Sequence, residues 1–201
     1  MSTAISDAFR LCLSRCYRCF SATCGLFFRG GSSSDDPARL IGRTLRFPSG
    51  PAATPARLLA EGGFSYVYAD ASGRYAVKAL LCADAAAERS VLREVDAHRR
   101  LAGADHVLPL LGHTFVDGGR GRWGVLLLPL VGASLRDVLN RRLCLDRSGA
   151  EDPLGLEEAL RLFGGIADAV GALHAAGLTH RDVKVENVLL DGAAGGACRP
   201  L

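Results

Sequence analysis

The sequence predicts an α+β protein with two unequal lobes, a smaller β-rich lobe followed by a mostly helical one. Short apolar segments separated by glycine-containing turns fill residues 57–81, which is typical of antiparallel strands. One charged, alanine-rich segment follows at residues 83–101 and predicts a helix. Beyond residue 134 the apolar residues recur every three or four positions, the period of a helix packed on one side.

The composition is that of a globular protein and excludes several other classes. The 201 residues are 49% hydrophobic, so the chain is long and apolar enough to bury a core. The net charge of +3 is too small to indicate a nucleic-acid partner, and we expect none. The densest apolar run, residues 11–28, is interrupted by Arg15 and Arg18 and does not reach the roughly 18 residues of a membrane span.

The individual elements are expected in a definite order. Strands are predicted at residues 57–60, 66–69 and 74–81, a helix at 83–101, a buried strand at 123–130, and helices at 134–143 and 156–176. Ser134 is expected to cap the shorter of the last two helices, and Gly177 to end the longer one. The long helix carries an apolar stripe, and where no further helix covers it we expect a surface prone to aggregation or to binding a partner: Leu156, Leu160, Phe163, Ile166, Val170 and Leu173.

Residues 1–55 differ from the rest and are expected to form a leader and flexible linker, with the folded domain at 56–201. Four of the seven cysteines lie in this leader: Cys12, Cys16, Cys19 and Cys24. Three interpretations stay open for them: a leader without a role, S-acylation that attaches the chain to a membrane, and a zinc site of loose spacing. We expect a cytoplasmic location, with membrane association if the cysteines are acylated.

Two motifs in the predicted β-rich lobe are typical of phosphate binding. The first, at residues 59–67, places Gly62 and Gly63 between two strands, where backbone N–H groups can approach a phosphate. A plain glycine hairpin is the alternative interpretation. The second is Lys78, one of only two lysines, flanked by apolar residues on the next strand. Glu94 follows sixteen residues later and is placed to form an ion pair with Lys78, although a solvated helix position is the alternative.

The third motif, at residues 180–190, follows the long predicted helix and contains the second lysine. Asp182 is placed to accept a hydroxyl proton, and Lys184 to neutralise a transferring phosphoryl group. Asn187 is placed to bind a divalent cation through its side-chain oxygen. Neither a helix nor a turn requires these residues in this order, so the motif indicates phosphoryl-transfer chemistry.

Over residues 58–190 the sequence resembles the eukaryotic protein kinases, with the three motifs in the expected order. The string His-Arg-Asp-Val-Lys-Val-Glu-Asn, together with Glu-Gly-Gly-Phe-Ser-Tyr-Val, looks most like the numb-associated family of serine/threonine kinases. The resemblance implies a protein-kinase-like α+β fold, with a complete small β-rich lobe, the first helices of the large α-helical lobe and its catalytic loop. It also implies ATP and Mg²⁺ as cofactors and protein serine or threonine hydroxyls as the substrate.

The same resemblance implies roles for individual residues. Asp182, Lys184 and Lys78 would be the catalytic residues, and Asn187 the magnesium ligand. Leu127 would occupy the gatekeeper position, with the backbone of Leu128 and Leu130 meeting the adenine. The nucleotide-binding set is completed by residues of the glycine-rich loop, the partner glutamate and one strand residue: Ala60, Glu61, Gly62, Gly63, Phe64, Ser65, Val67, Ala76 and Glu94.

Two departures from the kinase pattern bear on activity. Ala60 and Ser65 stand where the family's glycine-rich loop has its first and third glycines, and their small size should limit the effect on nucleotide affinity. After Asn187 the sequence reaches Leu201 without the Asp-Phe-Gly motif whose aspartate binds magnesium in the family. We therefore expect a fragment of a longer kinase that turns over ATP poorly by itself. The alternative is a catalytically inactive pseudokinase that binds a nucleotide or a partner.

Overall fold

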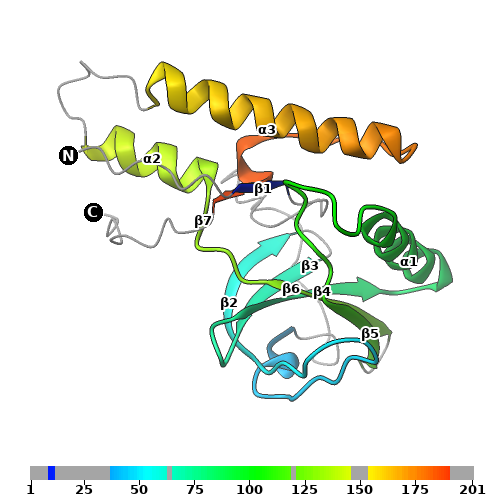
Figure 1. Ribbon diagram of the computed structural model, residues 1–201. Coiled ribbons are helices and arrows are strands. Elements are labelled where there is room, and N and C mark those ends of the chain that lie inside the picture. Colours follow the sequence, from blue (N-terminus) through cyan, green and yellow to red (C-terminus); the bar gives the residue numbers. More distant parts are fainter. Residues whose placement is uncertain (1–8, 12–36, 63–64, 119–120, 146–153, 191–201) are drawn as a thin grey trace. The chain divides into compact units, whose positions relative to one another are not determined.

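The computed structural model describes residues 9–11, 37–62, 65–118, 121–145 and 154–190, which fall into two compact units. The sheet unit takes its described residues from 37–102 and 109–130, and holds a five-stranded antiparallel sheet and one helix. The helical unit takes its described residues from 9–11, 103–108 and 131–190, and holds a three-stranded sheet and two long helices (Figure 1). This α+β content confirms the fold class predicted from the sequence.

The sheet unit is built on five strands in the order β2-β3-β4-β6-β5, each antiparallel to its neighbours. Their bounds are β2 Pro55–Gly62, β3 Ser65–Asp70, β4 Tyr75–Cys82, β5 Gly112–Asp117 and β6 Arg122–Pro129. Four of them match predicted strands, and β5 is the exception. Its sequence Thr-Phe-Val has high β-propensity. The turn after it is closed by the Gly118 N–H, which donates to the Gly121 carbonyl at 2.8 Å and leads into β6.

The predicted turn between β3 and β4 is held by the buried carboxylate of Asp70. Its Oδ2 accepts from the Ser72 hydroxyl at 2.7 Å and from the Ser72 N–H at 3.1 Å. Its Oδ1 accepts from the N–H groups of Arg74 and Tyr75, at 3.1 and 2.9 Å. Burial raises the pKa of Asp70, but these hydrogen bonds outweigh it and leave the pKa below its ordinary value.

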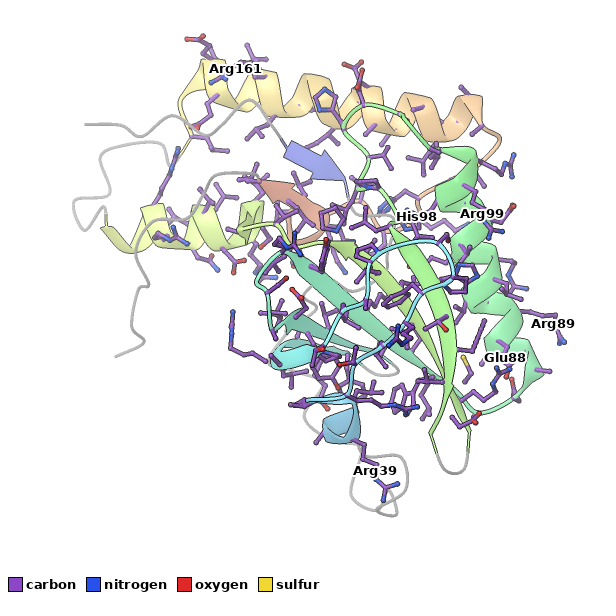
Figure 2. The ribbon with its side chains drawn as sticks, turned by 60° about the horizontal axis from the view of Figure 1, so that its bottom comes forward. Arg39, Glu88, Arg89, His98, Arg99 and Arg161 are labelled. Atoms are coloured by element: carbon purple, nitrogen blue, oxygen red, sulfur yellow. The ribbon has the colours of Figure 1, made fainter. Side chains whose placement is uncertain are left out.

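Helix α1 (Ala85–Arg100) matches the helix predicted after the third strand. Asp84 is its N-cap, because the Asp84 carboxylate accepts from the Ala87 N–H at 2.8 Å. A set of arginines lies on its solvent-exposed face, and Figure 2 shows two of them, Arg89 and Arg99, extending away from the sheet. The whole set is Arg89, Arg93, Arg99 and Arg100.

The inner face of α1 packs closely on the sheet. Val91 and Val95 form a core cluster with Leu126 and Cys82. Gly124 on β6 makes this approach feasible, since a Cβ there would lie 2.8 Å from Cγ2 of Val91. A larger residue at position 124 would push the helix off the strand.

The opposite face of the sheet is covered by a segment that the sequence assigns to the leader. Leu40, Leu45, Phe47 and Ala53 are all buried in the core there. They follow or belong to a short 3-10 turn, η1 (Pro37–Leu40), and a bridge between Leu45 and Ala53. The leader expected at residues 1–55 is therefore not uniform, because its last part belongs to the folded domain. The burial of these four residues could not be predicted from the sequence, because they lie in a proline-rich segment and do not follow the spacing of a strand or a helix.

The helical unit contains the strands β1 (Phe9–Leu11), β7 (Ala133–Ser134) and β8 (Val188–Leu190) in the order β1-β8-β7. The helix α2 (Leu135–Leu145) begins with the predicted serine cap. The Ser134 hydroxyl accepts from the Asp137 N–H at 3.2 Å, and Asp137 Oδ2 accepts from the Ser134 N–H at 3.1 Å. This reciprocal pair is the capping box, here with aspartate in place of glutamate.

Helix α3 (Leu156–Ala175) ends as predicted, but a different face is buried. Gly177 takes a φ of 68°, and the Leu178 N–H donates to the Leu173 carbonyl at 2.8 Å, which together form a glycine-terminated helix end. The residues buried along the helix are Leu162, Gly165, Ala169 and Leu173. Of the predicted stripe, the first three members are exposed: Leu156, Leu160 and Phe163. The exposure of these three residues agrees with the expectation that part of the stripe is uncovered, and two of the residues buried beside it, Gly165 and Ala169, are small and carry little periodic signal.

No helix among the described residues is long and apolar enough to cross a membrane. The leader cysteines Cys12, Cys16, Cys19 and Cys24 lie outside the described residues. Their three interpretations therefore stay predictions.

Candidate active site

Lys78 and Glu94 form the ion pair that their spacing suggests. Lys78 is in the middle of β4 and its side chain is only 2% exposed, an unusual place for a lysine. Its Nζ lies 3.0 Å from Oε1 and 3.3 Å from Oε2 of Glu94. Glu94 reaches it because it lies three residues after the buried Val91 on α1, and so on the side of the helix that faces the sheet. The ammonium is thereby held in a fixed position by a nearly bidentate carboxylate.

The predicted glycine-rich loop spans the end of β2 and the start of β3. Ala60, Glu61 and Gly62 are paired with Val67, Tyr66 and Ser65, so the two strands run together up to the turn. Val67 in turn pairs with Lys78 on β4, which brings the loop strand and the ammonium strand into register. Gly63 and Phe64, at the tip, lie outside the described residues.

Strand β6 places the predicted gatekeeper residue differently from the sequence assignment. Cross-strand partners in a sheet share a face, and Lys78 pairs with Leu126 while Ala76 pairs with Leu128. Leu127 pairs with Val77 and belongs to the core cluster on the other face, with Tyr68. Its side chain therefore lies on the opposite side of the sheet from the Lys78 ammonium. The gatekeeper assignment of Leu127 is corrected on this ground, and Leu128 is the neighbouring residue on the Lys78 face.

Leu130 also differs from its predicted role. Its N–H donates to the Arg74 carbonyl at 2.9 Å. That donor is already used within the protein and is not free for an adenine nitrogen. The misplacement of Leu127 and that of Leu130 have one cause. Side chains and backbone groups along a strand alternate with a period of two, so an assignment that is off by one residue puts each of them on the wrong side. Sequence spacing alone does not fix such a shift.

The helical unit holds the second group of predicted site residues. Asp182 and Lys184 are both about a quarter exposed, and Lys184 Nζ lies 2.9 Å from Asp182 Oδ2. Asn187, which ends the short 3-10 turn η2 (Val185–Asn187), is fully buried. Its Nδ2 donates to the Asp182 carbonyl at 2.7 Å and to Asp182 Oδ2 at 3.2 Å. The three side chains thus form one hydrogen-bonded cluster.

The electrostatics of this cluster keep Asp182 ionised. Partial burial raises the pKa of Asp182. The hydrogen bonds from Lys184 and Asn187 and the charge of Lys184 lower it by more, so the pKa of Asp182 is below its ordinary value. The Asp182 N–H also donates to His180 Nδ1 at 3.2 Å, which fixes the backbone of the loop. Between them Arg181 takes a φ of 63°, a strained conformation for a side chain of this size. These contacts restrain the loop that carries the carboxylate.

Asn187 is suited to bind a cation. Its Oδ1 is buried and has no hydrogen-bond partner among the described residues. Such an unsatisfied oxygen is costly in a folded protein unless something else occupies it, and a hard divalent cation prefers oxygen ligands of this kind. The described residues contain no cluster of three or more metal-ligating side chains. The unsatisfied Asn187 Oδ1 beside the Asp182 carboxylate offers the oxygen ligands that would suit magnesium.

One residue near this cluster was not singled out by its sequence. Arg136 on α2 donates through a guanidinium N–H to Glu186, the residue before Asn187. Glu186 is 14% exposed, and the pair ties η2 to α2. A single arginine on a helix surface gives no sequence signal, because only the fold shows that its partner lies next to Asn187.

The chain matches known proteins over most of its length. Residues 54–196 match the protein kinase domain family. The chain is 32% identical over 160 residues to serine/threonine-protein kinase ppk30 of Schizosaccharomyces pombe, covering 72% of this chain and 16% of that protein. It is 33% identical over 137 residues to serine/threonine-protein kinase 16 of Rattus norvegicus, covering 66% of this chain and 43% of that protein. The chain thus spans less than half the length of these two relatives.

Solved structures agree with this assignment. The kinase domain of PknI from Mycobacterium tuberculosis superposes with a TM-score of 0.54 at 25% identity, covering 74% of this chain and 57% of that one. Vaccinia related kinase 3 superposes with a TM-score of 0.51 at 18% identity, covering 76% and 47%, which supports the fold alone. Together with the ordered Lys78–Glu94 pair and the Asp182 cluster, these matches lead to one conclusion. The chain belongs to the protein kinase domain family.

Proposed function

We propose that this protein is an ATP- and magnesium-dependent serine/threonine protein kinase. The observation that carries the proposal is the cluster of Asp182, Lys184 and Asn187, whose hydrogen bonds hold an ionised carboxylate beside a buried, unsatisfied amide oxygen. The two relatives are named as serine/threonine-protein kinases, and we propose the same activity for this chain. The narrower membership of the numb-associated family rests on the strings at residues 61–67 and 180–187 and is part of the proposal.

Asp182 would act on the substrate hydroxyl. Because its pKa is lowered, the carboxylate is ionised at neutral pH and can orient the hydroxyl and accept its proton. Lys184 is hydrogen-bonded to the same carboxylate, and its positive charge would stabilise the phosphoryl group during transfer. The lysine two residues after the aspartate is also the feature that, by resemblance, indicates serine and threonine as acceptors.

Lys78 would bind the nucleotide phosphates. Glu94 neutralises part of its charge and fixes its direction, so the ammonium is already oriented before a ligand arrives. Asn187 would hold magnesium through Oδ1, and the cation when bound supplies charge neutralisation for the phosphate oxygens. Leu128 and Ala76, which share the Lys78 face of the sheet, are the apolar residues proposed to contact the base.

Binding of magnesium nucleotide by the purified chain tests the proposal first. A fluorescent ATP analogue is titrated with and without Mg²⁺, on the wild type and on Asn187→Ala, Lys78→Met and Arg74→Met. We expect magnesium to strengthen binding in the wild type, little magnesium effect in Asn187→Ala, weaker binding in Lys78→Met, and wild-type behaviour in the exposed Arg74→Met control. Magnesium-independent binding in the wild type, or equal affinity in all four proteins, would contradict the assignment.

A further inference from the structure

An ion pair joins the start of helix α2 to the residue before the proposed magnesium ligand. A guanidinium N–H of Arg136 donates to the carboxylate of Glu186, fifty positions away in the sequence. The Arg136 side chain is 47% exposed but the Glu186 side chain only 14%, so the carboxylate lies largely inside the protein. The pair therefore differs from an ordinary surface ion pair, because its acidic member is shielded from water and depends on Arg136 for a counter-charge.

The helix end that carries Arg136 is fixed by its own hydrogen bonds. Arg136 is the second residue of α2, within the turn that Ser134 and Asp137 close. The Asp137 carboxylate accepts from the Ser134 N–H at 3.1 Å and from the Ser134 hydroxyl at 2.7 Å. A first turn capped in this way is restrained, so the backbone of Arg136 is an anchor for its side chain.

Glu186 lies in a short turn directly before Asn187. η2 has only three residues, and Glu186 is the middle one. The Asn187 N–H donates to the Lys184 carbonyl at 2.9 Å, which closes the turn around Glu186. The Asn187 side chain is fully buried, and its Nδ2 donates to the Asp182 carbonyl at 2.7 Å. In a turn this short, a displacement of the Glu186 backbone also displaces Asn187.

We propose that Arg136 is a positioning residue for magnesium binding, acting through Glu186 on the orientation of Asn187. This role rests on the proposed function, since it connects Arg136 to the magnesium ligand of that site. Without the guanidinium, the Glu186 carboxylate loses its counter-charge and lowers its free energy by turning toward water. η2 moves with it, and Asn187 Oδ1 leaves its place beside the Asp182 carboxylate, where the two oxygens together suit a cation.

A purely structural role for Arg136 would lower stability without changing the magnesium dependence of nucleotide binding. Arg142 provides the matched comparison, because it lies on the same helix and its ion pair is also shielded from water. Its guanidinium contacts the carboxylate of Glu158 on α3 at 2.6 and 3.1 Å, and the two side chains are 24% and 12% exposed. That pair joins α2 to α3, whereas the Arg136 pair joins α2 to η2.

Magnesium titration of nucleotide binding tests the proposal. Magnesium chloride is titrated into wild type, Arg136→Gln and Arg142→Gln at a fixed concentration of a fluorescent ATP analogue, and each protein's affinity is also measured in EDTA. We expect the half-maximal magnesium concentration to rise about threefold to tenfold in Arg136→Gln, less than for a group in direct contact with a metal ligand, since Arg136 acts through one further residue. Arg142→Gln should match the wild type, and affinity in EDTA should be equal in all three proteins.

The wild type separates the two ways in which the test can fail. A wild-type chain that binds the analogue without any magnesium effect overturns the proposed function, and the role of Arg136 with it. A magnesium effect that is present in the wild type and equally strong in Arg136→Gln overturns the role of Arg136 alone. Equal weakening in Arg136→Gln and Arg142→Gln also overturns it, because the loss of any ion pair on α2 would then be sufficient.

Three further variants show whether the ion pair is the cause. Arg136→Lys keeps a positive charge facing Glu186 and should restore most of the magnesium effect. Glu186→Gln weakens magnesium binding from the other end of the pair and leaves no unpaired carboxylate, so it replaces Arg136→Gln if that protein does not fold. Combining Arg136→Gln with Glu186→Gln should give a loss no larger than Arg136→Gln alone. Losses that add in the combined variant, or no recovery in Arg136→Lys, would overturn the coupling.

Amide hydrogen exchange reads the same restraint without a nucleotide or a metal. The Asn187 N–H, which closes η2, should exchange faster in Arg136→Gln than in the wild type or Arg142→Gln, while the amides of α1 keep their protection. Unchanged exchange at Asn187 in a variant that binds magnesium more weakly would show that Glu186 does not transmit the effect, and the proposal would be wrong.

Discussion

The ammonium of Lys78 lies 3.0 Å from the carboxylate of Glu94, although the two residues belong to a strand and a helix sixteen positions apart. The pair is largely shielded from water, with the lysine side chain 2% and the glutamate side chain 18% exposed. A buried ion pair is weak evidence for stability, since removing both charges from water costs about as much as their attraction returns. Its place at the centre of the sheet, among buried apolar residues, points to a role in binding.

Lys78→Met should remove the proposed phosphate contact. We expect the phosphorylation rate, as kcat/KM for ATP, to fall by at least about 100-fold, comparable to losing one preorganised electrostatic donor in an active site. Glu94→Gln leaves the lysine but loosens its direction, so a smaller loss is expected. Steady-state kinetics of the natural full-length product measure both. Thermal unfolding must show that each variant is folded, and activity in Lys78→Met close to wild type would contradict the assignment.

Lys184→Met should move the acidic limb of the pH–rate profile to higher pH. The Lys184 ammonium lowers the pKa of Asp182 through a hydrogen bond and through its charge. Removing it raises that pKa, so the base becomes protonated at a higher pH and activity is lost earlier on acidification. The profile of kcat/KM between pH 4 and 8 gives the shift. Arg181→Met removes a neighbouring charge that makes no contact with the Asp182 carboxylate among the described residues, and should leave the limb in place.

Asp70→Asn should destabilise the sheet unit without touching the proposed site. The carboxylate accepts four hydrogen bonds in the β3–β4 turn, and the expected loss in the free energy of unfolding is about 1–3 kcal/mol at neutral pH. The folded pKa lies below the unfolded one, so this stabilisation is complete above the unfolded pKa. It disappears as pH falls through the folded pKa.

Denaturant unfolding of wild type and Asp70→Asn at several pH values checks this. The difference between the two proteins should shrink on acidification. A difference that grows or stays constant down to the lowest pH would show that the carboxylate charge is not what holds the turn.

Leu127→Ala and Leu128→Ala should have different consequences although the residues are adjacent and both fully buried. Leu127 packs with the core on the face away from Lys78, so its truncation should cost about 2–5 kcal/mol of stability and leave nucleotide selectivity unchanged. Leu128 shares the Lys78 face, so its truncation should alter affinity for nucleotides with enlarged adenine substituents. Titration with a series of such analogues separates the two, and the reverse pattern would restore the sequence assignment.

The sequence predicted the elements whose signals are local. The Asp70 turn, the Ser134 cap and the Gly177 helix end each depend on one residue type in one conformation, and all three are present. The Lys78–Glu94 pair was one of two interpretations of Glu94, and the structure shows the ion pair in place of a solvated helix position.

What the sequence missed depends on tertiary pairing. The core residues Leu40 and Phe47 belong to no periodic element, and the partner of β8 is a three-residue strand at the other end of the chain. The face of β6 was misassigned because a strand with apolar residues on both sides carries no alternation to fix which residue points where. In each case the deciding contact lies far away in the sequence.

The most direct test of the account is phosphoryl transfer itself. The natural full-length product is incubated with γ-labelled ATP, magnesium and a mixed protein substrate, in parallel with Asp182→Asn. The account predicts labelled phosphoserine or phosphothreonine in the wild type and a loss of at least about 100-fold in the variant. Equal labelling by both proteins would contradict the role of Asp182. Magnesium-nucleotide binding without any transfer by the wild type would show a nucleotide-binding module in place of a kinase.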